Sequence, residues 1–212
     1  MTKIINKKLK KSSRRWVERQ IHDIFSQQKK IQGYRSRSAF KLLDMEKKFK
    51  FLRNGSFILD LGSSPGGWAQ VLSKKIIKGK IVAIDILPME KVNNVTFILG
   101  DFLKIDIQRK IFNLFNRKID IIVSDMASNT TGSKDLDSYR TSELNLSVID
   151  FSKNILNSNG VLLCKLFMGK EFKEIKQKAN LIFKKVVFYK PTPSRKDSRE
   201  IYMFCKEIIE KI

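Results

Sequence analysis

Short apolar runs that alternate with helical stretches constrain the fold of this chain more than any other feature of its sequence. The runs, rich in Val, Ile and Leu, lie at 57–61, 81–85, 95–99, 119–125, 161–167, 186–189 and 201–205. Nearly continuous apolar strands are buried on both faces, as they are when helices cover both sides of a parallel sheet. The pattern therefore predicts an α/β protein with a seven-stranded, doubly wound, mostly parallel sheet.

The length of the chain and the order of these runs favour a single domain. A chain of 212 residues can bury one sizeable core, and its sequence shows no internal repeat. Residues 1–15 are basic and polar, which is typical of a disordered tail, and residues 16–212 are predicted to form the domain. A helix from Ser13 is expected as an N-terminal extension, and Ser38 is expected to cap a second helix.

The charge balance indicates a polyanionic partner. The sequence holds 43 Lys and Arg against 21 Asp and Glu, which gives a formal net charge of +22. Nucleic acid is the commonest polyanion that such an excess attracts. A biased genome would explain part of the excess. An acidic membrane surface is less favoured, because no basic amphipathic helix with a broad apolar face stands out.

The cysteine and histidine content argues against a disulfide framework and against a metal site. Cys164 and Cys205 both lie inside apolar runs, which predicts buried, reduced thiols, and His22 is the one histidine. No apolar run is long enough for a membrane span, and the N-terminus lacks a signal-peptide core. The expected location is the cytoplasm, with a mitochondrial presequence as the less favoured alternative.

Aspartates mark the carboxyl ends of the first four runs. Asp60, Asp85, Asp101 and Asp125 lie at or just after those ends, and the turn at 62–67 holds three glycines. In open α/β sheets, ligands bind at this edge of the sheet. Glycine allows a close approach of the backbone to a ligand. The sequence therefore predicts a binding pocket with an acidic lining.

Two classes of cofactor compete for this pocket. A dinucleotide site requires G-x-G-x-x-G, and the turn instead carries Pro65 within G-S-S-P-G-G, so a nicotinamide oxidoreductase is the weakest reading. The number of residues between Asp60 and Asp85 is about that expected between the first strand and an acid at the end of the second strand that accepts both ribose hydroxyls. A nucleoside cofactor without phosphates fits better, and an acidic pocket suits the cationic S-adenosylmethionine.

Seven short motifs resemble, in order and spacing, those of the FtsJ/RrmJ-like (RlmE-type) ribosomal RNA 2′-O-ribose methyltransferases, and the resemblance covers roughly residues 12–206. They are Y-R-S-R-S-A-F-K-L at 34–42, D-L-G-S-S-P-G-G-W at 60–68, D-I-L-P-M at 85–89, G-D-F at 100–102, S-D-M-A at 124–127, K-L-F at 165–167 and S-R-E-I-Y at 198–202. The resemblance implies the methyltransferase fold and S-adenosylmethionine as the cofactor. It implies cofactor contacts from Gly66, Trp68, Asp85, Asp101 and Asp125.

The resemblance also implies a catalytic set of two lysines and two carboxylates. The family's Lys-Asp-Lys-Glu set falls on Lys41, Asp125, Lys165 and Glu200. Two positions depart from the family pattern. Ser128 stands where proline usually follows S-D-M-A, and Pro193 lies where a serine is common. The first is expected to affect the wall on the target side of the site, and the second the RNA contacts.

These residue types suit methyl transfer to an alcohol. The reaction needs an in-line approach of the oxygen to the methyl carbon, so alignment is a large part of catalysis. A ribose hydroxyl also benefits from proton removal, and Lys165 is the candidate base. A cation at Lys41 and partial desolvation favour its neutral form, whereas the carboxylates oppose it. Cys164 is expected on the opposite face of the strand, in the core.

Without the resemblance, each of these side chains has a simpler reading. Lys165 would be a snorkelling lysine at the edge of the sheet, Glu200 half of a surface ion pair with Arg199, and Lys41 a solvated helix lysine.

Basic residues flank both parts of the catalytic set. Arginine forks suit phosphate, and a 2′-hydroxyl distinguishes RNA from DNA. The residues expected to contact RNA are Arg35, Arg37, Arg195, Lys196 and Arg199.

The preferred substrate is a uridine of 23S-type ribosomal RNA within the large ribosomal subunit. Only the resemblance implies the choice of a uridine. The expected form of the protein is a monomer. The alternatives are a 2′-O-methyltransferase of another RNA, such as transfer RNA or a messenger RNA cap, and a ribosome-assembly protein that binds RNA without catalysis.

Overall fold

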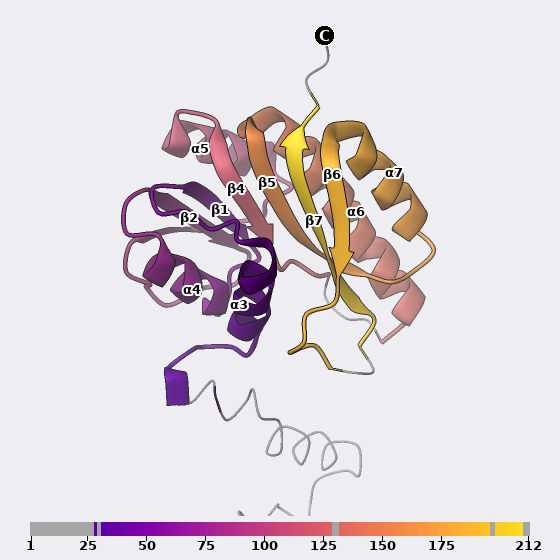
Figure 1. Ribbon diagram of the computed structural model, residues 1–212, viewed down its shortest axis with the longest axis horizontal. Helices are drawn as coiled ribbons and strands as arrows, with labels where there is room; N and C mark the ends of the chain where they lie inside the picture. Colours follow the sequence, from indigo (N-terminus) through magenta and orange to yellow (C-terminus); the bar gives the residue numbers. More distant parts are fainter. Residues whose placement is uncertain (1–27, 29–30, 129–131, 196–197, 210–212) are drawn as a thin grey trace, which may run out of the picture.

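The computed structural model describes residues 28, 31–128, 132–195 and 198–209. The predicted basic tail at 1–15, His22 and the helix expected from Ser13 lie outside the described residues. The described part folds around one central sheet with helices on both faces (Figure 1).

The sheet has seven strands in the order β3-β2-β1-β4-β5-β7-β6. The strands are β1 (Phe57–Leu61), β2 (Lys80–Asp85), β3 (Val95–Leu99), β4 (Ile119–Ser124), β5 (Leu156–Phe167), β6 (Phe183–Tyr189) and β7 (Glu200–Ile208). The first five are mutually parallel, and β7 lies antiparallel between β5 and β6. The predicted fold class is confirmed, and the chain order reverses at β1, which places a crevice beside its carboxyl end.

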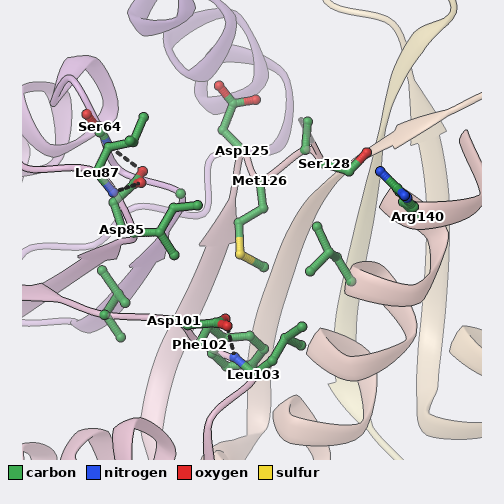
Figure 2. Close-up of a pocket in the computed structure, with 16 residues that line it drawn as sticks. Ser64, Asp85, Leu87, Asp101, Phe102, Leu103, Asp125, Met126, Ser128 and Arg140 are labelled. Atoms are coloured by element: carbon green, nitrogen blue, oxygen red, sulfur yellow. Dashed lines mark hydrogen bonds between the residues drawn. The ribbon is translucent and has the colours of Figure 1, made fainter. Parts of the chain in front are cut away.

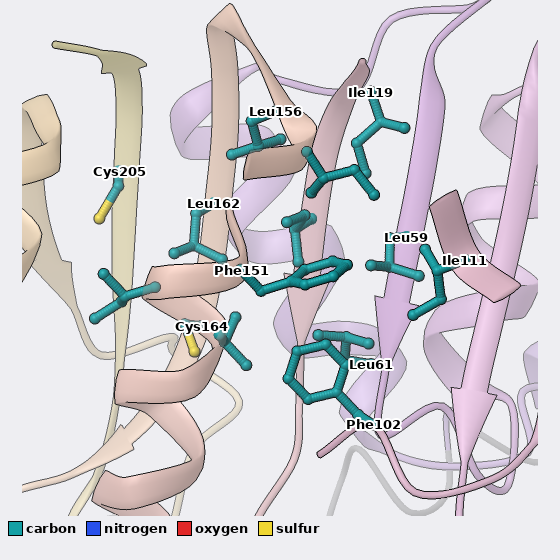
Figure 3. Packing of buried hydrophobic residues seen from close by; sticks show 14 of the residues in the cluster. Leu59, Leu61, Phe102, Ile111, Ile119, Phe151, Leu156, Leu162, Cys164 and Cys205 are labelled. Atoms are coloured by element: carbon teal, nitrogen blue, oxygen red, sulfur yellow. The ribbon is translucent and has the colours of Figure 1, made fainter. Parts of the chain in front are cut away.

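Helices cover the two faces of the sheet unequally. The described helices are α3 (Ser38–Phe49), α4 (Gly67–Lys75), α5 (Ile105–Phe115), α6 (Lys134–Ile155) and α7 (Phe172–Ile182). On one face, α3 and α4 pack over β1 and β7; on the other, α5, α6 and α7 enclose the larger core (Figure 1). In that larger core, Phe102 meets Phe151 edge to face, with ring centroids 5.2 Å apart (Figure 3).

The start of α3 differs from its prediction. Ser38 is the first helical residue rather than the cap, Arg37 occupies the cap position, and no side chain caps the helix there. The reason is local, because the Ser38 hydroxyl lies 2.5 Å from the hydroxyl of Ser36. The helix ends at Phe49. Lys50 follows as the C-cap, adopts a left-handed conformation (φ 49°) and donates its N–H to the Glu46 carbonyl.

The boundary between α6 and β5 also differs from the prediction. Strand β5 begins at Leu156, directly after α6, rather than after Gly160. Leu156 pairs with Ile119, and the Asn157 amide donates to Asp120 at 2.7 Å. These contacts join segments far apart in sequence, and they extend the strand beyond the apolar run at 161–167.

Both cysteines are buried and free, as predicted, and Cys164 lies in the larger core (Figure 3). Its neighbour Lys165 points to the other face of β5, where it is 8% exposed. Within the described residues, no helix is long and apolar enough to cross a membrane. The same part of the chain contains no cluster of His, Cys, Asp and Glu side chains that could hold a metal ion.

Candidate active site

The loops at the carboxyl ends of β1 to β4 enclose a cavity of about 510 Å³. The glycine-rich turn after β1 forms one wall, and Gly62 is needed there for two reasons. Its φ is +74°, and a Cβ atom would lie 2.8 Å from the Met126 backbone nitrogen. Gly62 therefore lets the turn after β1 pack against the chain that leaves β4.

Three aspartates from three strands line this cavity, as the sequence predicted for Asp85, Asp101 and Asp125 (Figure 2). The Asp85 carboxylate accepts hydrogen bonds from the backbone N–H groups of Ser64 and Leu87, each at 2.8 Å. Asp101 accepts one from Leu103 N–H at 3.0 Å. The backbone thus fixes the orientation of both carboxylates before any ligand binds.

The rest of the lining suits an adenine nucleoside. Phe102, Leu103 and Met126 contribute apolar side chains to the lining (Figure 2), and Ile86 adds another. The volume falls within the roughly 300–1,000 Å³ range of small-molecule sites. Carboxylates can accept the ribose hydroxyls, and their negative charge suits a sulfonium and an amino group. The residues present therefore fit S-adenosylmethionine.

Gly66 and Trp68 are not among the described residues that line this cavity. Trp68 is 2% exposed, and its indole N–H donates to the Ser38 carbonyl at 2.9 Å. Gly66 has a φ of +107°, and a Cβ atom there would lie 2.8 Å from the Arg35 guanidinium. Trp68 joins α4 to α3, and Gly66 packs against Arg35 just before α3. The contact of both residues with the cofactor stays a prediction.

Asp60 lies beneath the pocket, at the end of β1. It is fully buried, and neither carboxylate oxygen has a hydrogen-bond partner in the described structure. Burial raises the pKa of this carboxyl group well above its usual value, and the charges of Asp125 and Asp85 raise it further. The neutral form is therefore favoured here.

The four predicted catalytic side chains meet beside the cavity as two ion pairs. Lys41 Nζ lies 2.5 Å from Glu200 Oε1, and Lys165 Nζ lies 3.1 Å from Asp125 Oδ1. Lys165 also donates to the main-chain oxygen of Asp125. All four side chains are between 10% and 18% exposed, so each charge is largely removed from water. We call these four residues the catalytic cluster.

Tyr202 links the two pairs, although the sequence prediction did not assign it a role. Its phenol donates to Asp125 Oδ1 at 2.8 Å, and Lys41 Nζ lies 5.9 Å from its ring centroid. Burial raises the pKa of Tyr202 well above 10, and the carboxylates of Asp125 and Glu200 raise it further, so the phenol keeps its proton. The position follows from strand periodicity, because Tyr202 is two residues after Glu200 and pairs with Lys165.

Arg140 on α6 is a second residue that the sequence prediction missed. It is the one cation among the described residues that line the cavity, and it lies beside Ser128 on the wall away from Asp85 (Figure 2). Ser128 donates its N–H to Thr141 Oγ1 at 3.2 Å, a bond that a proline at this position cannot make. No local sequence signal marks Arg140, because α6 reaches the cavity only through the tertiary fold.

Arg35 is engaged within the protein rather than pointing to a ligand. Its guanidinium donates to the main-chain carbonyls of Glu90 at 2.7 Å and Lys91 at 2.8 Å, with a longer bond to Pro65. The predicted RNA contact by Arg35 therefore competes with three internal acceptors, a tie that local sequence could not reveal.

The remaining predicted RNA contacts lie on the loop before β7 and next to it. Arg37 donates to the Pro193 carbonyl at 2.7 Å. Arg195 and Arg199 are exposed, and Lys196 lies outside the described residues. Burial lowers the pKa of Arg37, and the nearby charge of Arg195 lowers it further.

The sheet order, the acidic nucleoside-sized pocket and the adjacent lysine–carboxylate cluster define an S-adenosylmethionine-dependent methyltransferase. Human methyltransferase-like protein 13, solved with S-adenosylhomocysteine, shares this fold with a TM-score of 0.58 at 16% identity, over 77% of this chain and 82% of that chain. The FtsJ-like methyltransferase family model matches residues 34–208, and the chain belongs to that family. The resemblance seen in the motifs is confirmed.

Relatives match nearly the whole chain. A protein named Ribosomal RNA large subunit methyltransferase E from Pelagibacter ubique is 43% identical over 92% of this chain and 96% of its own length. A protein of the same name from Legionella pneumophila is 40% identical with the same coverage. A solved Plasmodium falciparum structure, described as a ribosomal RNA methyltransferase, is 34% identical, with a TM-score of 0.76 over 84% of this chain and all of that one.

Proposed function

We propose that the protein methylates a ribose 2′-hydroxyl of large-subunit ribosomal RNA, on a uridine, with S-adenosylmethionine as the methyl donor. One observation carries the proposal. Asp125 belongs to both halves of the site, because it lines the nucleoside pocket and also holds the Lys165 amine at 3.1 Å. A hydroxyl placed beside Lys165 is therefore also beside the pocket that holds the donor.

The chain's residues supply alignment and proton removal. S-adenosylmethionine, when bound, supplies a methyl group activated by the positive sulfur. As the hydroxyl oxygen attacks, its proton passes to Nζ of Lys165, which acts as the general base once the ammonium that pairs with Asp125 has released a proton to solvent. Asp125 holds that amine in place, and the Tyr202 phenol in turn orients Asp125. The Lys41–Glu200 pair flanks the incoming ribose. Positioning of this kind is expected to contribute most of the rate.

Charge and relatives support RNA as the substrate. The formal net charge of +22 favours a polyanion, and the relatives carry names that state a large-subunit ribosomal RNA substrate. The same lysine–carboxylate cluster would also serve methylation of transfer RNA or a messenger RNA cap. A binding protein without catalysis is less favoured, because all four side chains are present and paired.

The working form we propose is a monomer in the cytoplasm, with residues 16–212 as one methyltransferase domain and 1–15 as a basic tail. All four members of the catalytic cluster come from one chain, which supports action as a monomer. Two buried free thiols suit a reducing compartment.

The test is transfer of labelled methyl groups to large ribosomal subunits that lack their natural methylations, followed by nucleoside analysis. Wild-type protein is expected to yield 2′-O-methyluridine. Lys165→Ala is expected to lower the rate by a factor on the order of 10²–10⁴, the usual contribution of a general base, while binding of S-adenosylmethionine persists. Lys153→Ala, which changes an exposed lysine on α6, is the matched control and is expected to keep full activity. Equal activity of the two variants would contradict the role of Lys165.

A further inference from the structure

A second cavity, of about 760 Å³, opens at the opposite edge of the sheet from the catalytic cluster. Five cations line it: Lys48, Lys50, Arg53, Lys185 and Lys206. We call it the distal basic cavity. It lies where β4 and β5 begin and β7 ends, the upper edge of the sheet in Figure 1. Its floor includes Val161 and Phe204, which belong to the face of the sheet that α3 covers.

The lining is far more basic than the chain as a whole. The sequence has about two basic residues per acidic one, 43 against 21, whereas Asp120 is the one acid among the described residues of this lining. Both oxygens of Asp120 are already engaged, by Phe57 N–H at 2.8 Å and by the Asn157 amide at 2.7 Å. A single carboxylate offsets at most one of the five positive charges, so the lining keeps a net positive charge.

The arrangement of these cations is unfavourable for the protein alone. Lys185 and Lys206 are direct cross-strand partners on β6 and β7, and like charges in that position destabilise a sheet. Glu207 lies 3.4 Å from Lys206 and offsets part of the repulsion, but both side chains of that pair are about 40% exposed and screened by water. A bound polyanion would remove the repulsion that remains.

Helix α3 joins this cavity to the catalytic cluster. Lys41 lies in its first turn, and Lys48 and Lys50 lie at its end. Seven residues separate Lys41 from Lys48, which corresponds to about 10 Å along the helix axis. Along β5, Val161 in the cavity and Lys165 in the cluster are about 13 Å apart. These separations are short enough for one RNA molecule to reach both places.

We propose that the distal basic cavity binds the phosphate backbone of the RNA substrate, away from the nucleotide that is methylated. The inference rests on the proposed function for its choice of RNA. The cavity then supplies affinity without sequence preference, because lysines contact phosphates as point charges. Its role is to hold the substrate, and the methyl transfer chemistry does not depend on it.

The test compares two triple variants with the same loss of charge. The first is Lys50→Gln, Lys185→Gln and Lys206→Gln, which removes three of the five positive charges that line the cavity. The matched control is Lys110→Gln, Lys173→Gln and Lys176→Gln, exposed lysines on α5 and α7, across the sheet. Binding to protein-free large-subunit ribosomal RNA is measured over a range of salt concentrations, together with thermal unfolding and the rate of methyl transfer at saturating RNA.

The cavity variant is expected to bind RNA more weakly than the control, by a factor on the order of tenfold at 0.1 M salt, and to reduce the slope of log K against log salt by roughly 2–3. It should unfold at a temperature no lower than wild type, because a like-charge pair is removed. The saturated rate should not change. Equal RNA binding by the two variants overturns the proposal, and so does a loss seen with intact subunits but not with protein-free RNA, which points to a ribosomal protein. A wild-type protein that binds RNA but transfers no methyl group refutes the proposed function instead.

Discussion

Replacing Tyr202 by Phe removes a single oxygen atom from the centre of the catalytic cluster and keeps the ring that packs near Trp68. The phenol is fully buried and donates to Asp125 Oδ1 at 2.8 Å. A hydrogen bond to a charged group contributes about 1.5–3 kcal/mol. Because Asp125 must hold Lys165 during the transfer, that energy is needed in the transition state. At about 1.4 kcal/mol per tenfold change, kcat/KM is expected to fall roughly 10- to 150-fold.

Tyr189→Phe is the matched control for this experiment. Its phenol donates to Asp44 Oδ2 at 2.7 Å, so the same atom is deleted from a comparable bond outside the catalytic cluster. Each variant is expected to lower the unfolding temperature by roughly 3–12 °C, because a loss of about 1.5–3 kcal/mol shifts the midpoint by about 2–4 °C per kcal/mol in a domain of this size. Methyl transfer to large ribosomal subunits is measured for both, with S-adenosylmethionine varied in one series and RNA in the other.

The two results separate orientation from stability. A loss of kcat/KM that is confined to Tyr202→Phe supports a phenol that positions Asp125. If Tyr202→Phe keeps activity within about twofold of wild type, or if both variants lose activity equally, the reasoning from the 2.8 Å bond is refuted.

Two further perturbations test the pocket. Asp60→Asn is expected to gain unfolding temperature over wild type at pH 8, and to gain less at pH 5. The pKa of Asp60 is higher in the folded than in the unfolded state, so wild type loses stability as the pH rises from the unfolded towards the folded pKa. The amide of the variant has no proton to lose and does not show this loss. A pH-independent difference in scanning calorimetry would contradict this assignment. Gly62→Ala should weaken S-adenosylmethionine binding by at least about tenfold and lower stability, because its Cβ would lie 2.8 Å from Met126. Gly33→Ala, also at positive φ but with no atom within 4 Å, should leave calorimetric binding unchanged, and equal effects would refute the packing argument.

The sequence predicts the central strands well because β1, β2, β4 and the second half of β5 are buried on both faces, and burial leaves a local signature in the form of continuous apolar runs. Strands β3 and β6, at the two edges of the sheet, are only partly buried. Prediction from the sequence fails where distant segments decide the local structure. Strand β5 starts at Leu156 because Leu156 pairs with Ile119 and Asn157 bonds to Asp120, contacts that the apolar run at 161–167 does not reveal. Arg35 is a residue type that suits an RNA contact, but its guanidinium donates to the main-chain carbonyls of Pro65 and Glu90, about 30 and 55 residues later in the chain.

The candidate site divides in the same way. Motif order alone identifies the four members of the catalytic cluster, and the structure brings all four together. It does not identify Tyr202 as their link or Arg140 as part of the wall, because each role depends on a neighbour from another element. Nor does motif order separate a residue that lines the pocket from one that supports it, as Asp85 and Trp68 illustrate.

The position of β7 in the sheet sets the order in which the protein can become active. This strand is the last of the seven along the chain, yet it inserts between β5 and β6 and carries Glu200 and Tyr202. Lys41 is synthesised early and meets Glu200 only after a further 159 residues. A growing chain that has reached α6 already contains every described residue that lines the nucleoside pocket, from Gly62 to Leu144, well before it can assemble the catalytic cluster. Competence for methyl transfer therefore arises only once the chain is synthesised through β7.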